Sequence, residues 1–338
     1  MKSRKLLVGI VAAVGMMILI LDGKRALNGA VEGIDLCIRT VIPSLFPFFI
    51  LSIGIVGNWT GLTIPPLRRF GKIMRIPPGM ESLLIPGFLG GYPVGAQAIA
   101  ESYRRKQITA ATAERLAAFC NNAGPAFIFG IISQFFPDIG YCWIIWGVHI
   151  VSAVLVAAVL PNREPPQVAT VATKSMTPSE IMDRALRATA TVCGWVVVFR
   201  VILTFLDQWL FWFLPVSVRP LAIGIIELTN GCCALGNISH IGLRMIIAVT
   251  PLSLGGLCVW MQTASVLSGL SIKTFMAGKL LQAVFSAIIM ILIQLIFPSV
   301  LQCVPSTRLL MIAAAGIVLL GLFLFFINRC SNPKKTVV

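Results

Sequence analysis

The sequence predicts an all-α polytopic membrane protein, with about eight transmembrane helices and two re-entrant helical hairpins arranged as an inverted repeat. Three observations predict this class. Of the 338 residues, 57% are hydrophobic and only 12% are charged, roughly half the charged fraction of a soluble domain. Several apolar runs reach the roughly 20 residues that cross a bilayer. Basic residues gather between these runs, as they do in cytoplasmic loops. A soluble enzyme and a disordered chain are therefore excluded.

The N-terminal region, residues 1–29, is predicted to be a transmembrane helix whose amino end is cytoplasmic. Basic residues precede an apolar run from Leu6 to Leu21. A secretory signal peptide begins in the same way, but no clear small-residue cleavage site follows the run. The second pass covers about 33–57, and Pro43 and Pro47 interrupt it.

The first re-entrant hairpin is predicted between residues 83 and 100. Its core reads Gly87-Phe88-Leu89-Gly90-Gly91-Tyr92-Pro93-Val94-Gly95, which contains too many helix breakers for a straight span. Basic residues flank the segment on both sides, at 68–75 and 104–106. Both ends of the segment are therefore expected on the cytoplasmic side of the membrane.

Two passes and a polar linker complete the first half. Residues 109–136 form a pass that is broken at Asn121-Asn122-Ala123-Gly124-Pro125, and residues 139–160 form the next pass. The linker, 161–184, is polar and is expected in the cytoplasm. It contains Thr177-Pro178-Ser179-Glu180, a capping box that predicts a helix start.

The second half of the chain follows the same plan. Its predicted elements are a pass at about 190–214, a hairpin rich in helix breakers at 218–238, and passes at about 243–268 and 275–298. The last segment, 299–338, is predicted to be a transmembrane helix at 308–327 with a basic tail.

An internal duplication is predicted to relate residues 30–160 to residues 185–298. Leu83–Ala96 aligns with Ile223–Gly236 at a constant offset of 140, although few letters are identical. In the predicted topology the two halves cross the membrane in opposite directions. Inverted repeats with broken helices near the midplane are a recurring plan of secondary transporters.

The distribution of basic residues supports that topology. With both termini in the cytoplasm, 20 of the 27 Lys and Arg residues fall on the cytoplasmic side, Lys273 and Lys279 among them. Five fall on the outer side, so the count agrees with the excess of positive charge inside. The excess of Lys and Arg over Asp and Glu is therefore explained by cytoplasmic loops, and no nucleic-acid partner is expected.

Polar groups at the helix breaks are the candidate substrate site. A break frees backbone N–H and C=O groups, which a membrane tolerates only where they line a cavity or bind something. The half-helix that begins near Pro125 points a positive end into the membrane, which suits a carboxylate. The alternative is that Asn and Gly simply pack the helices closely. The predicted substrate-binding residues are Gly90, Gly91, Tyr92, Asn121, Asn122, Gly124, Thr229, Asn230, Ser253 and Gln262.

Glu227 is the candidate site for a coupling ion or a proton. It follows a run of apolar residues in the second hairpin, and a carboxylate at that depth is a functional candidate by default. The alternative is a structural ion pair with Arg200. Asp207 and Arg200 lie seven residues apart and share a face, and each is equally suited to pairing or to the site. His149, alone in an apolar pass, is expected to pack or to form hydrogen bonds.

Four segments resemble the nucleoside-recognition (Gate) domain family, and most closely its sporulation integral membrane proteins. They lie within about residues 30–298 and read Pro43-Ser44-Leu45-Phe46-Pro47-Phe48-Phe49, Gly87 to Ala96, Phe119 to Ile128, and Glu227-Leu228-Thr229-Asn230-Gly231. The resemblance implies a multi-pass protein of the bacterial inner membrane, in the mother-cell membrane around the forespore. It also implies export of dipicolinic acid from the mother cell during spore maturation.

The sequence thus predicts a carrier of a small polar or anionic metabolite, with dipicolinic acid as the first candidate. The dianion suits amides and helix N-termini better than a carboxylate, which favours an ion or proton role for Glu227. A nucleoside-type carrier and a non-transporting scaffold for spore-envelope assembly are the alternatives. No metal-ligand spacing, phosphate loop or Ser–His–Asp pattern is found, so no enzyme activity, metal or cofactor is expected. The expected partners are a small solute and the bilayer, and homo-oligomerisation stays open.

Overall fold

The computed structural model describes residues 2–59, 65–161 and 175–301, and every regular element in these ranges is helical. Five helices are long and apolar enough to cross a membrane by length and composition, namely Gly23–Ile55, Gly140–Val159, Pro178–Trp209, Ile241–Val266 and Lys273–Ile296. The prediction of an all-α polytopic membrane protein is therefore confirmed.

The elements of the first half are α1 (Lys2–Leu21), α2 (Gly23–Leu36), the π-helical turn η1 (Cys37–Val41), α3 (Ile42–Trp59), α4 (Pro65–Ile73), η2 (Glu81–Leu83), α5 (Leu84–Phe88), α6 (Val94–Arg104), α7 (Ala110–Phe119), α8 (Pro125–Gly130), η3 (Ile132–Phe135) and α9 (Gly140–Val159). Those of the second half are α10 (Pro178–Trp209), α11 (Arg219–Ile226), α12 (Leu228–Cys233), η4 (Ala234–Asn237), α13 (Ile241–Leu254), α14 (Gly256–Val266), α15 (Lys273–Ile296) and η5 (Pro298–Leu301).

Most of the eight predicted passes correspond to these helices. The pass predicted at 6–21 is α1, and the pass predicted at 109–136 is α7 and α8 with a break between them. The pass predicted at 308–327 and the basic tail lie outside the described residues, as do residues 162–174 of the predicted linker. The capping box is present, because Thr177 and Glu180 exchange side-chain and backbone hydrogen bonds at the start of α10.

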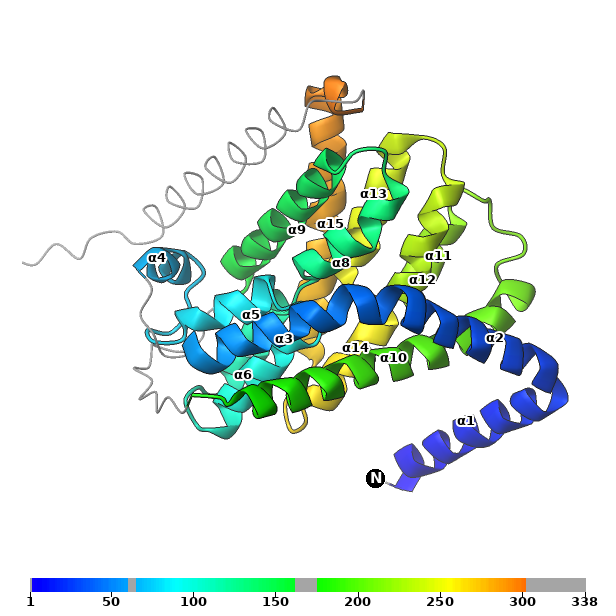
Figure 1. The fold of residues 1–338 in the computed structure, drawn as a ribbon, viewed down its shortest axis with the longest axis horizontal. Coiled ribbons are helices and arrows are strands. Elements are labelled where there is room, and N and C mark those ends of the chain that lie inside the picture. The colour runs from blue at the N-terminus through cyan, green and yellow to red at the C-terminus, as the bar shows by residue number, and fades with distance from the viewer. Residues whose placement is uncertain (1, 60–64, 162–174, 302–338) are drawn as a thin grey trace, which may run out of the picture.

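Two long helices cross a bundle of the others. Helices α9, α13 and α15 pack side by side, while α2–α3 and α10 lie together across them (Figure 1). The α2–α3 pair and α10 run in opposite chain directions (Figure 1). The π-helical turn at Cys37–Val41 joins α2 to α3, so that the helix continues from one to the other. Two prolines follow this turn, and each lacks a backbone N–H donor, so a change in the hydrogen-bonding pattern is expected here.

Small residues set the distance between α2 and α10. A Cβ atom on Gly29 would lie 2.7 Å from Thr204 Oγ1, and one on Gly33 would lie 2.9 Å from Val197 Cα. The two glycines are four residues apart and so share one face of α2. This is the small-xxx-small arrangement that lets helix backbones approach each other in membranes.

Replacing Gly33 by Ala is therefore expected to push α2 away from α10. The added methyl group meets the backbone of Val197, which has no rotamer to change, so the expected loss of stability is about 1–3 kcal/mol. Thermal unfolding of the purified protein in detergent measures the loss. Gly23→Ala is the matched control on the same helix, since its Cβ atom would meet no neighbouring heavy atom within 4 Å among the described residues. Equal melting temperatures for the two variants would contradict the proposed packing.

Each of the two predicted hairpins closes on a pair of glycines. In the first hairpin, a Cβ atom on Gly95 would lie 3.2 Å from Gly87 Cα and 2.4 Å from Cys120 O. In the second, a Cβ atom on Gly231 would lie 2.2 Å from Gly224 Cα. The two pairs correspond at an offset a few residues shorter than the constant 140 of the sequence alignment. The glycine pairs thus give a second alignment of the two hairpins, and the internal duplication stays a prediction.

The tip of each hairpin packs against a broken helix. A Cβ atom on Gly124, at the break between α7 and α8, would lie 2.9 Å from Gly91 N. A Cβ atom on Gly256, at the break between α13 and α14, would lie 2.9 Å from Gly224 O. Gly255 and Gly256 both have positive φ angles, +83° and +69°, which explains why glycine occupies this break. Both halves therefore place a hairpin tip on a helix break.

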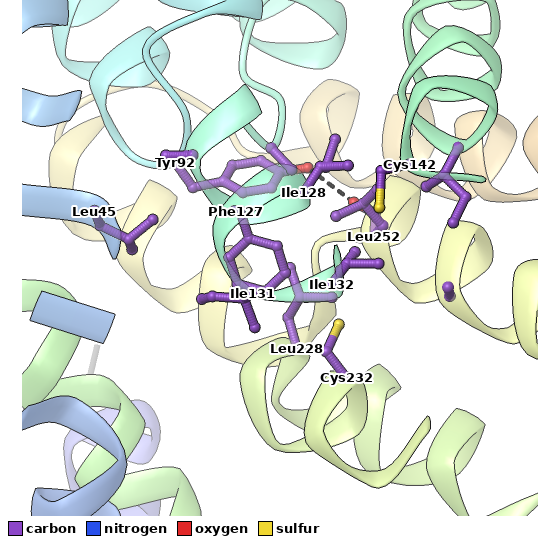
Figure 2. Packing of buried hydrophobic residues seen from close by; sticks show 14 of the residues in the cluster. Leu45, Tyr92, Phe127, Ile128, Ile131, Ile132, Cys142, Leu228, Cys232 and Leu252 are labelled. Atoms are coloured by element: carbon purple, nitrogen blue, oxygen red, sulfur yellow. Dashed lines mark hydrogen bonds between the residues drawn. The ribbon is translucent and has the colours of Figure 1, made fainter. Parts of the chain in front are cut away.

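The hydrophobic core lies around these crossings. Figure 2 shows it as side chains from α3, the first hairpin, α8, α9, α12 and α13 that point toward one another. Tyr92 reaches across this core, and its hydroxyl donates to the carbonyl of Leu252, 3.4 Å away (Figure 2). The core thus fixes the first hairpin against α13.

Candidate functional site

A small cavity of about 40 Å³ lies where the two hairpins meet α14. Most of its wall is apolar, from α3, α8, α10 and α14. Seven of the eleven residues predicted for the site line it, and these are Gly90, Gly91, Tyr92, Gly124, Glu227, Thr229 and Gln262. The structure therefore brings together groups that lie up to about 170 residues apart in the sequence, a separation that no local pattern spans.

Glu227 lies at the break between α11 and α12 and caps α12. Its carboxylate accepts hydrogen bonds from the backbone N–H groups of Thr229 (3.1 Å) and Asn230 (2.7 Å) and from Asn230 Nδ2 (2.6 Å). The side chain is 2% exposed. All of its hydrogen-bond donors among the described residues are neutral, so the carboxylate has no cationic partner there. A buried carboxylate in that state is costly unless something else neutralises it.

The alternative of a structural ion pair between Glu227 and Arg200 is wrong. Arg200 Nε donates to Glu32 Oε2 at 2.9 Å, and Asp207 pairs with Arg219 at 2.6 Å. These four residues line a separate hollow of about 380 Å³ between α2, α10 and α11. Arg200 and Asp207 do share a face of α10, but each pairs with a different element.

Gln262 lines the cavity and carries a buried oxygen without a donor among the described residues. The side chain is 3% exposed, and its Nε2 donates to Cys258 Sγ at 3.2 Å. Within the described part of the chain, its Oε1 accepts no hydrogen bond. A buried acceptor without a donor costs about 1–3 kcal/mol. Gln262 Oε1 and the Glu227 carboxylate therefore suit a cation or a proton donor.

Asn121 and Asn122 hold the backbone of the first hairpin and do not line the cavity. Asn121 Oδ1 accepts from the backbone N–H of Ala96 (3.2 Å), and its Nδ2 donates to Thr263 Oγ1 (3.0 Å). Asn122 Nδ2 donates to the carbonyls of Gly87 (3.0 Å) and Phe119 (2.6 Å). The half-helix α8 that follows has only six residues. Its dipole is therefore weaker than the sequence interpretation assumed.

Asn230 and Ser253 also lie behind the cavity wall. Asn230 is engaged with Glu227, and Ser253 Oγ lies 2.9 Å from His149 Nδ1. His149 Nε2 accepts from the backbone N–H of Ala123 at 3.2 Å, which assigns the proton of the neutral ring to Nδ1. His149 thus forms hydrogen bonds, as expected for a lone buried histidine.

Lys279 is the residue that sequence analysis missed. It was predicted at the cytoplasmic surface beside Lys273, but the structure buries it completely within α15. Its Nζ donates to Asn122 Oδ1 (3.0 Å) and Gln282 Oε1 (2.8 Å). The signal that could have found it is its place inside the predicted pass 275–298, where a charged residue is a functional candidate.

Gln282 joins this lysine to His149. Its Nε2 donates to Asn122 Oδ1 at 3.0 Å and to the carbonyl of His149 at 3.1 Å. The side chains of Asn122, His149, Lys279 and Gln282 are all buried. They form one polar network between the α7–α8 break, α9 and α15.

Replacing Asn122 by Ala is expected to destabilise the protein by about 2–4 kcal/mol, because it leaves Lys279 and two backbone carbonyls each short of a buried partner. Thermal unfolding in detergent measures this. Asn58→Ala is the control, since Asn58 makes one exposed hydrogen bond, to Gly54 O. If both variants melt at the wild-type temperature, Asn122 does not organise the network.

In the described ranges, no three His, Cys, Asp or Glu side chains are grouped so that they could hold a metal ion. The chemistry that the cavity offers is therefore that of a carboxylate, a carboxamide oxygen and backbone groups.

Comparison with known proteins gives one partial relative. A stretch of 105 residues is 37% identical to the sporulation integral membrane protein YlbJ of Bacillus subtilis (strain 168). The match covers 30% of this chain and a quarter of that protein's length. No protein-family model matches the chain. No solved structure matches it. The resemblance to the Gate domain family therefore stays a prediction, while the helices and this relative agree on a multi-pass integral membrane protein.

Proposed function

We propose that the protein carries a small polar or anionic metabolite across the membrane and is not an enzyme. The observation that carries this proposal is the cavity between the two hairpins, where Glu227 and the unpaired oxygen of Gln262 are buried inside a membrane domain. Buried ionisable groups at broken helices mark solute and ion pathways in membrane proteins. A scaffold has no need of such costly groups.

The cavity is small in this conformation. At about 40 Å³, it has room for a bare cation or a few water molecules, since one water needs about 10–15 Å³ measured in this way. A ring-sized solute enters only if the hairpins separate from the helix breaks. The proposed carrier therefore alternates between this form, whose cavity is small, and forms in which one hairpin has moved.

In this proposal Glu227 binds the coupling cation or proton. A cation or proton beside Glu227 would balance its charge and satisfy the Oε1 atom of Gln262. A solute carboxylate would be repelled from the same place. The cation and the anion are therefore expected on different sides of the cavity, with the cation on the side of the second hairpin.

The proposed solute is dipicolinic acid, exported from the mother cell during sporulation. Two observations support this, namely the motifs that resemble the Gate domain family and the partial similarity to YlbJ, a protein named for sporulation. On this proposal the protein lies in the mother-cell membrane around the forespore, with both termini in the cytoplasm.

Reconstitution in liposomes tests the proposed function. Uptake of radiolabelled dipicolinate and of uridine is measured with and without an inward Na⁺ or proton gradient, beside protein-free liposomes. We expect dipicolinate uptake above the protein-free level that rises with one of the gradients. Uptake of uridine alone would favour the nucleoside-type carrier. No uptake of either solute would sink the proposal and favour the scaffold.

A further inference from the structure

Lys279 is a buried lysine without an acidic partner among the described residues. Its side chain is 0% exposed, and its ammonium group donates to two neutral carboxamide oxygens, those of Asn122 and Gln282. Burying an ion among neutral groups costs several kcal/mol in real proteins. A lysine kept at that cost in a membrane domain is a functional candidate.

The ammonium group of Lys279 lies behind the wall of the cavity. Its Nζ is 5.3 Å from the centre of the Tyr92 ring, and Tyr92 lines the cavity. The hydrogen bond from the Tyr92 hydroxyl to Leu252 O holds that ring in place. The Tyr92 ring therefore lies beside both the ammonium group and the cavity. Protein screens the electric field of the ammonium group much less than water does.

The position of Lys279 is fixed by close helix packing. A Cβ atom on the preceding residue, Gly278, would lie 2.6 Å from Ala118 Cβ and 2.9 Å from Ala118 O. This contact brings α15 against α7, directly before the break at Asn121 and Asn122. Lys279 is thereby held beside the first hairpin, next to the Tyr92 ring and Asn122, whereas Glu227 belongs to the second hairpin.

We infer that Lys279 is the residue that makes this protein select negatively charged solutes. A solute carboxylate bound beside Tyr92 and Gly124 would supply the negative charge that the Lys279 ammonium lacks. The Glu227 side of the cavity would meanwhile hold the cation. This inference rests on the proposed carrier function and adds the residue that recognises the charge of the solute.

A ligand-binding experiment tests the inference without requiring transport. The probes are dipicolinate and its uncharged analogue pyridine-2,6-dicarboxamide, which share one ring and differ in charge. Their dissociation constants are measured by the shift in melting temperature of the purified protein. We expect the wild type to prefer dipicolinate and Lys279→Gln to lose about tenfold or more of that preference, the size expected for one charge at this range.

A second variant covers the case in which Lys279→Gln fails to fold. Gln282→Glu places a carboxylate where Gln282 Oε1 now accepts from Nζ at 2.8 Å, so it neutralises Lys279 without removing it. It is expected to lower the preference for dipicolinate in the same way. Lys273→Gln removes an exposed charge from the same helix and is expected to bind as the wild type does.

The outcomes separate this inference from the proposed function. A wild type that binds both probes equally, or neither, overturns the inference. So does Lys279→Gln or Gln282→Glu protein that keeps the wild-type preference. If the wild type binds dipicolinate with the expected dependence on Lys279 but liposomes show no uptake, the proposed carrier function fails and the charge selection by Lys279 stands.

Discussion

Replacing Glu227 by Gln is expected to lower gradient-driven uptake of the transported solute about 10- to 100-fold, the loss that follows when a charged group's interaction worth about 1.5–3 kcal/mol is removed. Gln has nearly the same shape as Glu, but it cannot take up a proton or balance the charge of a cation. The measurement is initial uptake into liposomes with and without the driving gradient. The variant is expected to lose the response to the gradient.

The same substitution also weakens the cap of α12. The Gln side chain offers one acceptor oxygen in place of two, so one of the bonds from Thr229 or Asn230 is lost, at a cost of about 1 kcal/mol. The melting temperature of the variant therefore has to be measured beside its uptake. A variant that melts near the wild type and still responds fully to the gradient would show that Glu227 is only a helix cap.

Glu101→Gln is the matched control for this experiment. Glu101 lies at the end of α6, away from the cavity, and accepts from Arg105 Nε at 2.8 Å and from Arg104 at 3.0 Å. Its pKa is lowered from the ordinary value for glutamate, although burial acts in the opposite direction, because both guanidinium groups donate to it. Partly exposed pairs of this kind contribute about 0–1 kcal/mol, so uptake is expected within about twofold of the wild type.

Replacing Gly231 by Ala is expected to destabilise the protein more than Gly33→Ala, because its contact is closer. Its Cβ atom would lie 2.2 Å from Gly224 Cα and 2.5 Å from Gly224 N, so the two arms of the second hairpin could no longer touch. Overpacking usually costs about 1–3 kcal/mol, and more where only backbone atoms can yield. Thermal unfolding in detergent and the yield of monodisperse protein measure the effect.

Gly194→Ala is the control for Gly231→Ala. A Cβ atom on Gly194 would meet no neighbouring heavy atom within 4 Å in the described structure, and Gly194 lies inside α10. Alanine there is expected to be neutral or to stabilise by up to about 1 kcal/mol, because glycine is a poor helix former. If Gly231→Ala melts as Gly194→Ala does, the glycine contact is not what closes the hairpin.

Composition and local patterns were enough to predict the fold class and the break between α7 and α8. Hydropathy and the length of apolar runs are local properties, and the bilayer converts them directly into helices. Helix breakers are local as well, because Gly and Pro change the backbone wherever they stand. The break at Gly124 and the membrane depth of Glu227 could therefore be predicted without any knowledge of contacts.

Tertiary structure alone decided which groups face each other. Arg200 pairs with Glu32 and not with Glu227, and Lys279 bonds to Asn122 across 157 residues of sequence. Such partners depend on the packing of distant helices, which periodicity and composition do not predict. In the sequence, Lys279 resembles the basic residues that flank membrane passes, because it lies only four residues inside a predicted pass. The contact of the neighbouring Gly278 with α7 is what buries it. The physical reason is that burial is a property of the packed helices and not of the residue.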